Sequence, residues 1–230
     1  MIKIKFLDKL LSLIYIRPCF YCRSAKEDTL LCSSCRKKIR YRDAAVYKKI
    51  EDCRVYACCI YEGVVKELVQ SFKYKGKKHL APVFAEIMHN YYAKLNLTGN
   101  FLILSVPIHK KRLKERRYNH IDIAARYFSK LSMLKYNTKL LTRIKDTEKQ
   151  YKLTHAERTA NIKGAFAVNE AETIDKNTPL LLIDDITSTG ATFSEIIKQL
   201  KQHGFKNITA IALSAPELHS AEKKRVNEAE

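Results

Sequence analysis

The stretch LLLIDDITSTGAT, residues 180–192, constrains the fold more than any other part of the chain. It runs four apolar residues into two adjacent aspartates, Asp184 and Asp185, and then into a loop of small residues. An apolar run with no polar alternation is typical of a parallel strand that is buried on both faces. Segment 193–204 then shows the apolar spacing of a helix and ends at Gly204. This order of strand, loop and helix predicts an α/β fold.

Strand and helix patterns alternate along the rest of the chain. Strand patterns occupy segments 54–63, 101–108, 139–144, 165–168, 180–184 and 207–215, and helical patterns occupy 64–76, 80–95, 121–131 and 193–204. The polar segment 150–164 is interpreted as a loop or a helix. With 230 residues and 46% hydrophobic content, the chain is long enough for one main core. We predict a largely parallel sheet flanked by helices, with a small N-terminal module and a charged tail at 216–230.

The loop after the two aspartates has the features of a phosphate site. In a parallel sheet the ligand crevice lies at the carboxyl ends of the strands, where Asp184 and Asp185 fall. The following loop offers backbone N–H groups, hydroxyls and a glycine beside a helix N-terminus, where Thr192 and Glu195 are spaced as a capping box. A ribose 5-phosphate would satisfy both the loop and the carboxylates. The alternative is a simple turn with two surface acids. Neither a nucleoside-triphosphatase loop nor a dinucleotide fingerprint is present.

This stretch resembles the phosphoribosyl-pyrophosphate signature of the type I phosphoribosyltransferases, with a DD-x-x-[ST]-[ST]-G-x-T core. The resemblance implies that Asp184 and Asp185 are catalytic and hold the ribose hydroxyls, directly or through water and Mg²⁺, while pyrophosphate leaves. Magnesium would arrive with the substrate. Thr187 departs from the family, which commonly has an apolar or aromatic residue there. The residues that would grip the 5-phosphate are Thr187, Ser188, Thr189, Gly190, Ala191 and Thr192.

The basic segment SVPIHKKRLKERRYNH, residues 105–120, lies where type I phosphoribosyltransferases place the loop that receives pyrophosphate. A leaving group of high negative charge needs at least two cations, although a solvated charged face is the alternative for Lys110, Lys111 and Lys114. Together with patterns at 143–150, 158–161 and 164–166, this segment closely resembles the ComF family of competence-related proteins. Tyr118 follows Arg117 where that family commonly has Gly-Phe. Gln150 and Asn161 match positions of the family's motif and are given no role. The resemblance also implies these pyrophosphate or nucleic-acid contacts: Lys110, Arg112, Arg116, Arg117, Asn119, Arg143 and Arg158.

All seven cysteines lie in the first 59 residues, and four of them form two C-x-x-C pairs. Cys19 with Cys22 and Cys32 with Cys35 can complete a tetrahedral site with no open position, which is typical of structural zinc. Redox-active or merely buried cysteines are the alternatives. The ComF resemblance also implies a four-cysteine zinc finger, so we expect a helix and zinc finger at 1–45 and a phosphoribosyltransferase-like domain at 46–215. The remaining thiols, interpreted as core or surface residues, are Cys53, Cys58 and Cys59.

Two further features admit a ligand-binding and a structural interpretation. His109 and His120 flank the basic segment, and we expect both to be loop histidines without a ligand. Segment 71–79, SFKYKGKKH, interleaves aromatic residues with lysines, a pattern that suits single-stranded nucleic acid. It equally suits a solvated helix end with Phe72 turned inward.

The formal charge of +19 favours polyanionic partners. The first functional hypothesis is a ComF-like protein of natural transformation that binds phosphoribosyl pyrophosphate with Mg²⁺ and assists handling or uptake of single-stranded DNA, alongside proteins of the uptake machinery. The alternative is a phosphoribosyltransferase that acts on a nucleobase in salvage, although no base-reading hood is recognisable. A zinc-stabilised adaptor with a relict fold is the third. Whether the site turns over is left open.

Cysteine usage fits a reducing cytoplasm. Residues 1–16 have leucines and isoleucines at helical spacing, but Lys3, Lys5, Asp8 and Lys9 interrupt them. This predicts an amphipathic helix and neither a signal peptide nor a membrane span. We therefore expect a cytoplasmic protein. The alternative is a cytoplasmic protein that is attached peripherally to the inner membrane.

Overall fold

The computed structural model describes residues 17–147 and 154–217. The predicted N-terminal helix, Gln150 and most of the charged tail lie outside the described residues.

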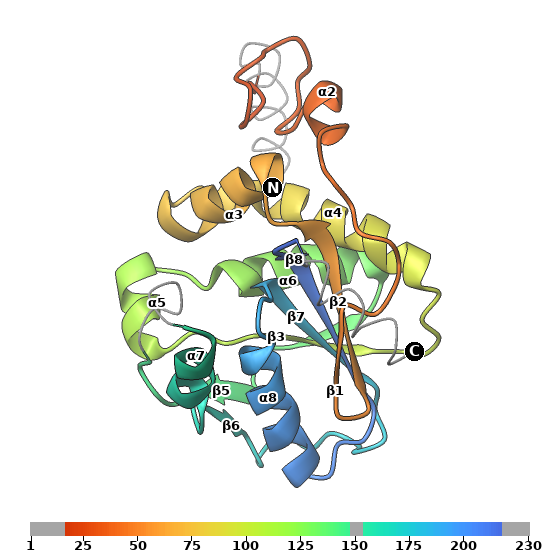
Figure 1. The fold of residues 1–230 in the computed structure, drawn as a ribbon, viewed down its shortest axis with the longest axis vertical. Helices are drawn as coiled ribbons and strands as arrows, with labels where there is room; N and C mark the ends of the chain where they lie inside the picture. Colours follow the sequence, from red (N-terminus) through yellow and green to blue (C-terminus); the bar gives the residue numbers. More distant parts are fainter. Residues whose placement is uncertain (1–16, 148–153, 218–230) are drawn as a thin grey trace, which may run out of the picture.

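The centre of the fold is a six-stranded sheet with the strand order β1-β2-β8-β7-β3-β4 (Figure 1). All neighbouring pairs are parallel except β1 with β2, so the prediction of a largely parallel sheet is confirmed. From edge to edge the strands are β1 (Lys48–Ile50), β2 (Cys53–Ile60), β8 (Ile208–Ala215), β7 (Leu180–Ile186), β3 (Leu102–Ser105) and β4 (Lys135–Asn137).

Helices and a small antiparallel strand pair cover the two faces of this sheet. Leu181 and Ile183 of β7 pack with the helices α3 (Gly63–Tyr74), α4 (Ala81–Tyr92) and α6 (His120–Ser132). Leu180 and Leu182 pack with the helix α8 (Ala191–Gln202) and with β5 (Leu141–Arg143) and β6 (Phe166–Val168), which form a separate antiparallel pair. Alternate residues of β7 therefore face two different apolar cores, which explains its unbroken apolar sequence.

The strand order places a topological switch point between β7 and β3. From β3 the chain passes through α6 to β4 on one side, and it later returns to β7 on the other side. In open α/β sheets ligands bind outside the carboxyl ends of strands at such a point. The carboxyl ends of β3 and β7 are Ser105 and Ile186, so Asp184 and Asp185 lie at the expected edge.

The N-terminal cysteine module packs on α4. In Figure 1 it stands above α3 and α4. Leu31 is fully buried in the same apolar cluster as residues of α4, and the Arg36 guanidinium donates two hydrogen bonds to Glu86 of α4, at 2.7 and 2.8 Å. Arg36 ends the short helix α2 (Ser33–Arg36), so the cysteine module is connected to the main core.

Several short elements were not predicted from the sequence. The edge strands β1 and β4 have three residues each and are mostly polar. The helix α5 (Lys110–Arg116), which replaces the predicted basic loop, contains one apolar residue and therefore has no apolar stripe. Two single 3-10 turns, Lys78–Leu80 and Ala93–Leu95, flank α4.

The predicted capping box at the start of α8 is wrong. The N-cap is Gly190, in a left-handed conformation, and Glu195 instead accepts a hydrogen bond from the Gly164 backbone N–H at 2.9 Å. A capping box does start the helix α7 (His155–Ile162), where Thr154 and Glu157 satisfy each other's backbone N–H groups. The helical alternative for segment 150–164 is therefore confirmed from residue 155 onward. No helix among the described residues is long and apolar enough to cross a membrane.

Candidate functional site

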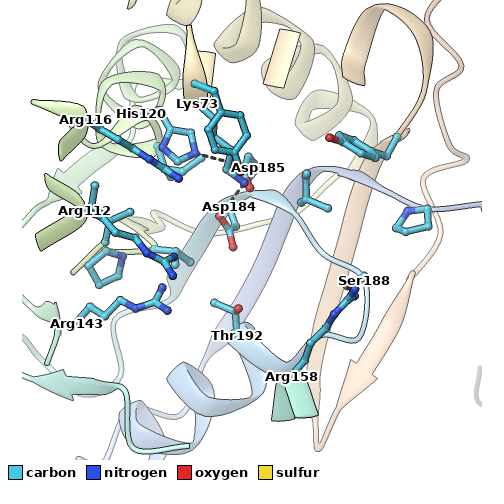
Figure 2. Close-up of a pocket in the computed structure, with 18 residues that line it drawn as sticks. Lys73, Arg112, Arg116, His120, Arg143, Arg158, Asp184, Asp185, Ser188 and Thr192 are labelled. Carbon is cyan, nitrogen blue, oxygen red and sulfur yellow. Dashed lines mark hydrogen bonds and ion pairs between the residues drawn. The ribbon is translucent and has the colours of Figure 1, made fainter. Parts of the chain in front are cut away.

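A cavity of about 330 Å³ opens at the carboxyl ends of β3 and β7, at the switch point of the sheet (Figure 2). Residues far apart in sequence line it together: Lys73, Arg112, Arg116, His120, Arg143, Arg158, Asp184, Asp185, Ser188 and Thr192. Its remaining wall is largely apolar or aromatic and includes Tyr61, Tyr74, Ile186 and Pro216. The cavity therefore combines two carboxylates, several cations and one less polar side.

Asp185 is held by two cationic or titratable partners. Its Oδ2 accepts from Lys73 Nζ at 2.6 Å and lies 2.5 Å from His120 Nε2. Burial would raise the pKa of Asp185, but Lys73 and then His120 outweigh it and hold that pKa below its ordinary value. Asp185 is 3% exposed. It is therefore an ionised carboxylate that is already paired within the protein.

Asp184 differs from its neighbour in both geometry and ionisation. Its Oδ1 accepts the backbone N–H of Asp185 at 2.8 Å, and its carboxylate points into the cavity (Figure 2). Burial and then the charge of Asp185 raise the pKa of Asp184 to about 8. The two adjacent acids thus differ, because Asp185 belongs to a buried charge network and Asp184 faces the cavity.

Arginines from three elements line the cavity around this network. Arg112 and Arg116 come from α5, Arg143 ends β5 and Arg158 lies on α7. Together with Lys73 they place five cationic side chains around two carboxylates. Burial and then the charge of Arg112 lower the pKa of Arg143 to about 10. An excess of positive charge in a partly enclosed site favours a polyanionic ligand.

Hydrogen bonds within the protein hold several of these arginines in place. Arg158 Nη1 donates to Ser188 Oγ at 3.0 Å, and Arg112 Nη2 donates to the Thr147 carbonyl oxygen at 2.6 Å. Arg143 donates to the Thr147 hydroxyl, and its guanidinium lies 5.3 Å from the centre of the Phe166 ring. Such fixed guanidinium groups lose less conformational entropy when they bind a phosphate.

The predicted phosphate loop is divided between cavity and interior. Ser188 and Thr192 line the cavity, as predicted. Thr187 is 4% exposed, and its backbone N–H donates to the Ser214 carbonyl oxygen at 3.0 Å, so its side chain packs inside the fold. The backbone N–H of Ala191 donates to Thr189 Oγ1 at 3.1 Å. Gly190 has a φ of +79° where the loop becomes α8, a conformation that glycine adopts at little cost.

Three of the predicted basic or polar contacts lie outside the cavity lining. Lys110 and Arg117 are exposed. Asn119 is the N-cap of α6 and accepts the Ile121 backbone N–H at 3.1 Å, so it positions α6. Arg117 itself has a φ of +62°. A left-handed backbone turn, which a glycine would adopt at less cost, therefore occurs at this arginine.

Sequence reasoning missed two residues of the site, His120 and Lys73. His120, expected as a loop histidine without a ligand, is 3% exposed, begins α6 and contacts Asp185. His109 is a helix N-cap that faces Asp146, with Nδ1 and Oδ1 3.6 Å apart. Lys73 belongs to the lysine-aromatic segment 71–79, in which the inward position of Phe72 is confirmed by its full burial. The sequence signal for Lys73 was its position next to the apolar Phe72 at the end of a helix. At such an end both side chains can approach the sheet.

Replacing Lys73 by methionine is expected to lower the free energy of unfolding by about 2 kcal/mol, because Asp185 would keep only one of its two partners in a buried position. Urea denaturation at neutral pH measures this loss. The control is Lys75→Met, which breaks an exposed pair with Glu67 near the same helix end and should cost about 0.5 kcal/mol or less. Equal losses in both variants would contradict the proposed anchoring of Asp185 by Lys73.

Four cysteines form a second candidate site, away from this cavity. The Sγ atoms of Cys19, Cys22, Cys32 and Cys35 all lie within 4.8 Å of one another, and those of Cys22 and Cys32 are 3.7 Å apart. A tetrahedral ion with metal–sulfur bonds of about 2.3 Å separates its sulfurs by about 3.8 Å. Burial raises the pKa of Cys19, but backbone N–H groups outweigh it and lower that pKa to about 6. The cluster therefore fits a metal ion bound by four sulfurs.

The other three cysteines are core residues. Cys53, Cys58 and Cys59 lie on β2 and are at most 2% exposed. Burial raises the pKa of each of these thiols, which makes them poor nucleophiles. None of the cysteines among the described residues forms a disulfide.

Known proteins with similar sequences carry names that refer to competence and to DNA utilization. The chain is 24% identical to Competence protein ComFC of Bacillus subtilis over 206 residues, which is 78% of this chain and 81% of that protein. It is 24% identical to DNA utilization protein YhgH of Escherichia coli over 199 residues, 81% of this chain and 85% of that protein. Competence protein F of Haemophilus influenzae is 25% identical over 151 residues, 64% of this chain and 66% of that protein.

These relatives confirm the resemblance to ComF proteins that the motifs predicted. No protein-family model matches the chain. Similar solved structures include adenine phosphoribosyltransferase from Leishmania tarentolae (TM-score 0.37, 13% identity, 66% of this chain and 74% of that chain) and hypoxanthine phosphoribosyltransferase from Staphylococcus aureus (TM-score 0.36, 12% identity, 60% and 64%).

Proposed function

We propose that this protein binds phosphoribosyl pyrophosphate together with Mg²⁺ and acts in natural transformation, where it assists the handling or uptake of single-stranded DNA. The observation that supports this ligand is the cavity at the switch point. There five cationic side chains surround two carboxylates that differ in ionisation, beside a loop at a helix N-terminus. The names of the similar proteins, Competence protein ComFC and DNA utilization protein YhgH, support the role in DNA uptake.

The three parts of the ligand have different partners in the cavity. The 5-phosphate lies against Ser188, Thr192 and the N-terminus of α8, where backbone N–H groups and the helix dipole favour an anion. The ribose hydroxyls face Asp184, whose Oδ2 is left for a ligand after Oδ1 bonds to backbone. The pyrophosphate lies among the arginines of α5 and β5, which neutralise its charge, whereas Arg158 of α7 lies beside Ser188 at the 5-phosphate end.

Magnesium fits this arrangement because a hard cation prefers carboxylate and phosphate oxygens. Asp184 is the protein group that would approach it. Bound magnesium would neutralise pyrophosphate and strengthen it as a leaving group. Arg112, Arg143 and Arg158 would hold the phosphates in place, and Asp185 would maintain the positions of Lys73 and His120.

Single-stranded DNA is the second partner in this proposal. Tyr74 is 59% exposed, and the Arg116 guanidinium lies 5.2 Å from the centre of its ring. A shallow groove that borders the cavity is lined by Lys73, Tyr74, Arg112 and Arg116. Exposed aromatic rings beside cations suit unpaired bases and their phosphates, and the net charge of +19 exceeds what one small anion requires.

Phosphoribosyl transfer to a nucleobase-like acceptor is the second candidate function. Tyr61, Tyr74 and Pro216 form a less polar wall of the same cavity, where a planar acceptor could lie against the ribose. In that reaction the bond between C1 of the ribose and pyrophosphate would break and a bond from C1 to the acceptor nitrogen would form. A test for pyrophosphate release with purine and pyrimidine bases separates this function from binding alone.

The remaining parts of the proposal concern metal and location. Zinc is the metal proposed for Cys19, Cys22, Cys32 and Cys35, because four thiolates in a closed tetrahedral arrangement are typical of structural zinc. Reduced thiols fit a cytoplasmic protein, with proteins of the DNA-uptake machinery as partners and a peripheral position at the inner membrane.

Calorimetric titration of the protein with phosphoribosyl pyrophosphate, with and without Mg²⁺ and with and without a single-stranded oligonucleotide, tests the function. We expect Mg²⁺-dependent binding of phosphoribosyl pyrophosphate and separate binding of the oligonucleotide that weakens as salt increases. Absence of phosphoribosyl pyrophosphate binding at millimolar concentration would contradict the ligand, and absence of oligonucleotide binding would contradict the role in DNA handling.

Arg112→Met is expected to weaken the binding of Mg²⁺–phosphoribosyl pyrophosphate about tenfold, since it removes one fixed guanidinium from the pyrophosphate side. Lys114→Met is the matched control, because Lys114 lies on the same helix, is exposed and is absent from the cavity lining. An equal effect of both variants would show that only the overall charge matters and would contradict the placement of pyrophosphate beside α5.

A further inference from the structure

Lys48, the first residue of β1, reaches the candidate phosphate loop from a distant part of the chain. Its Nζ donates a hydrogen bond to the Thr189 carbonyl oxygen at 2.5 Å. Pairing of Lys48 with Val55 of β2 fixes the backbone that presents this side chain. Lys48 does not line the cavity. The edge strand β1, which shows no strand pattern in the sequence, therefore carries a cation to the backbone of the loop.

The stem of Lys48 also packs on the loop at Gly190. A Cβ atom added to Gly190 would lie 3.3 Å from Cδ of Lys48 and 3.4 Å from Cδ1 of Ile50. Both contacts are tight, and the φ of Gly190 is +79°, a conformation that disfavours other residues. Lys48 thus contacts two consecutive loop residues, one through its ammonium group and one through its methylene groups.

The bond to Thr189 determines the direction of the next backbone N–H group. The described residues contain no cis peptide bond, and in a trans peptide the C=O and the following N–H point in opposite directions. Because the Thr189 carbonyl points toward Lys48, the Gly190 N–H points away from β1. Gly190 lies in the same loop as Ser188 and Thr192, which line the cavity.

The ammonium group of Lys48 forms no salt bridge with an acidic residue in the described part of the chain. Its charge lies behind the Thr189–Gly190 peptide, so it strengthens the positive potential at the Gly190 N–H.

We infer that Lys48 is a positioning residue for the 5-phosphate of the ligand: it orients the Thr189–Gly190 peptide so that the Gly190 N–H donates to the phosphate. This inference rests on the proposed function, because it assigns a role within the same site. Lys48 would affect the phosphate end of the ligand and leave the pyrophosphate end, beside the arginines, nearly unchanged. That separation gives the inference its test.

The experiment compares wild-type protein with Lys48→Met, Lys48→Arg and Lys49→Met in calorimetric titrations with ribose 5-phosphate and, separately, with Mg²⁺–pyrophosphate. Methionine keeps the stem that packs on Gly190 and removes the ammonium group. We expect Lys48→Met to weaken ribose 5-phosphate binding about tenfold and Mg²⁺–pyrophosphate binding less than twofold, and we expect Lys48→Arg to restore part of the loss. Lys49→Met removes the same charge from the opposite side of the strand and is the control.

A second measurement detects the loop directly and requires no tight binding. The protein contains six glycines, so ¹⁵N-glycine labelling gives a simple spectrum in which Gly190 is identified by the signal lost in Gly190→Asn. Inorganic phosphate should shift this signal in the wild type and in Lys49→Met, and should leave it nearly unchanged in Lys48→Met.

The outcomes distinguish failure of the inference from failure of the proposed function. Wild-type protein that binds Mg²⁺–pyrophosphate and ribose 5-phosphate, with Lys48→Met equal to Lys49→Met, would overturn the role of Lys48 alone. Equal weakening of both ligands in Lys48→Met would do the same, because it would indicate a general structural effect. Wild-type protein that binds neither ligand would overturn the proposed function, and this inference with it.

Discussion

Asp184→Asn is expected to weaken the binding of Mg²⁺–phosphoribosyl pyrophosphate about 100-fold, or by ~2.7 kcal/mol, while it raises the melting temperature. Asp184 is the carboxylate that faces the cavity, whereas Asp185 is paired with Lys73 and His120. An amide in place of Asp184 cannot neutralise a divalent cation or accept from two ribose hydroxyls as strongly. Calorimetric titration and thermal unfolding of the same samples measure both effects.

The expected gain in stability depends on pH, and its sign follows from the ionisation of Asp184. An unfolded aspartate ionises near pH 4, whereas burial and Asp185 raise the pKa of Asp184 to about 8 in the folded protein. Between these values the folded protein retains a proton that the unfolded chain has released, so the wild type loses stability as the pH rises. Asp184→Asn has no such proton. Its melting temperature should therefore exceed that of the wild type by only a small margin at pH 5 and by roughly 3 °C or more at pH 8.5.

Ligand binding should show the complementary dependence. Magnesium requires an ionised Asp184, so wild-type affinity for Mg²⁺–phosphoribosyl pyrophosphate should increase between pH 7 and 9, and this increase should be absent in Asp184→Asn. Glu115→Gln, on the exposed face of α5, is the control for removal of one negative charge near the site. A variant at Asp184 that binds like Glu115→Gln, or that is less stable than wild type at pH 8.5, would contradict the division of roles between the two aspartates.

The parts of the fold that were predictable are those whose sequence pattern is produced by burial alone. The strands β7 and β8 show unbroken apolar runs because both of their faces are covered. The edge strands β1 and β4 are short and half exposed. They form because they pair with a neighbouring strand, so their own residues show no strand pattern. The helix α5 is charged along nearly its whole length, and its pattern was indistinguishable from that of a basic loop.

The same distinction applies to the site. The aspartates, Ser188 and Thr192 follow one strand directly and could be identified from a single stretch. Lys73, His120 and Lys48 come from α3, α6 and β1, and their approach to that stretch depends on the order of strands in the sheet. One sequence by itself does not reveal the order of strands in the sheet, so these contacts could be found only in the structure.

Cys32→Ser is expected to remove the bound metal and to lower the melting temperature by roughly 10 °C or more. Four sulfurs within 4.8 Å of one another complete the site, and loss of one thiolate leaves an incomplete coordination shell whose binding energy no longer stabilises the fold. The effect should extend beyond the cysteine module because Leu31 lies in the same apolar core as α4 and because Arg36 pairs with Glu86 of that helix. Zinc content by mass spectrometry and thermal unfolding measure the two effects.

Cys53→Ser is the matched control, because Cys53 is equally buried but lies on β2, outside the four-sulfur cluster. It should lose stability through its altered packing alone and should keep its zinc. A chelator should lower the melting temperature of wild type and Cys53→Ser, and it should have no effect on Cys32→Ser, because that variant has no metal to lose. Full zinc content in Cys32→Ser would contradict a metal site at these cysteines, and a zinc-free wild type with an unchanged melting temperature in chelator would favour merely buried thiols.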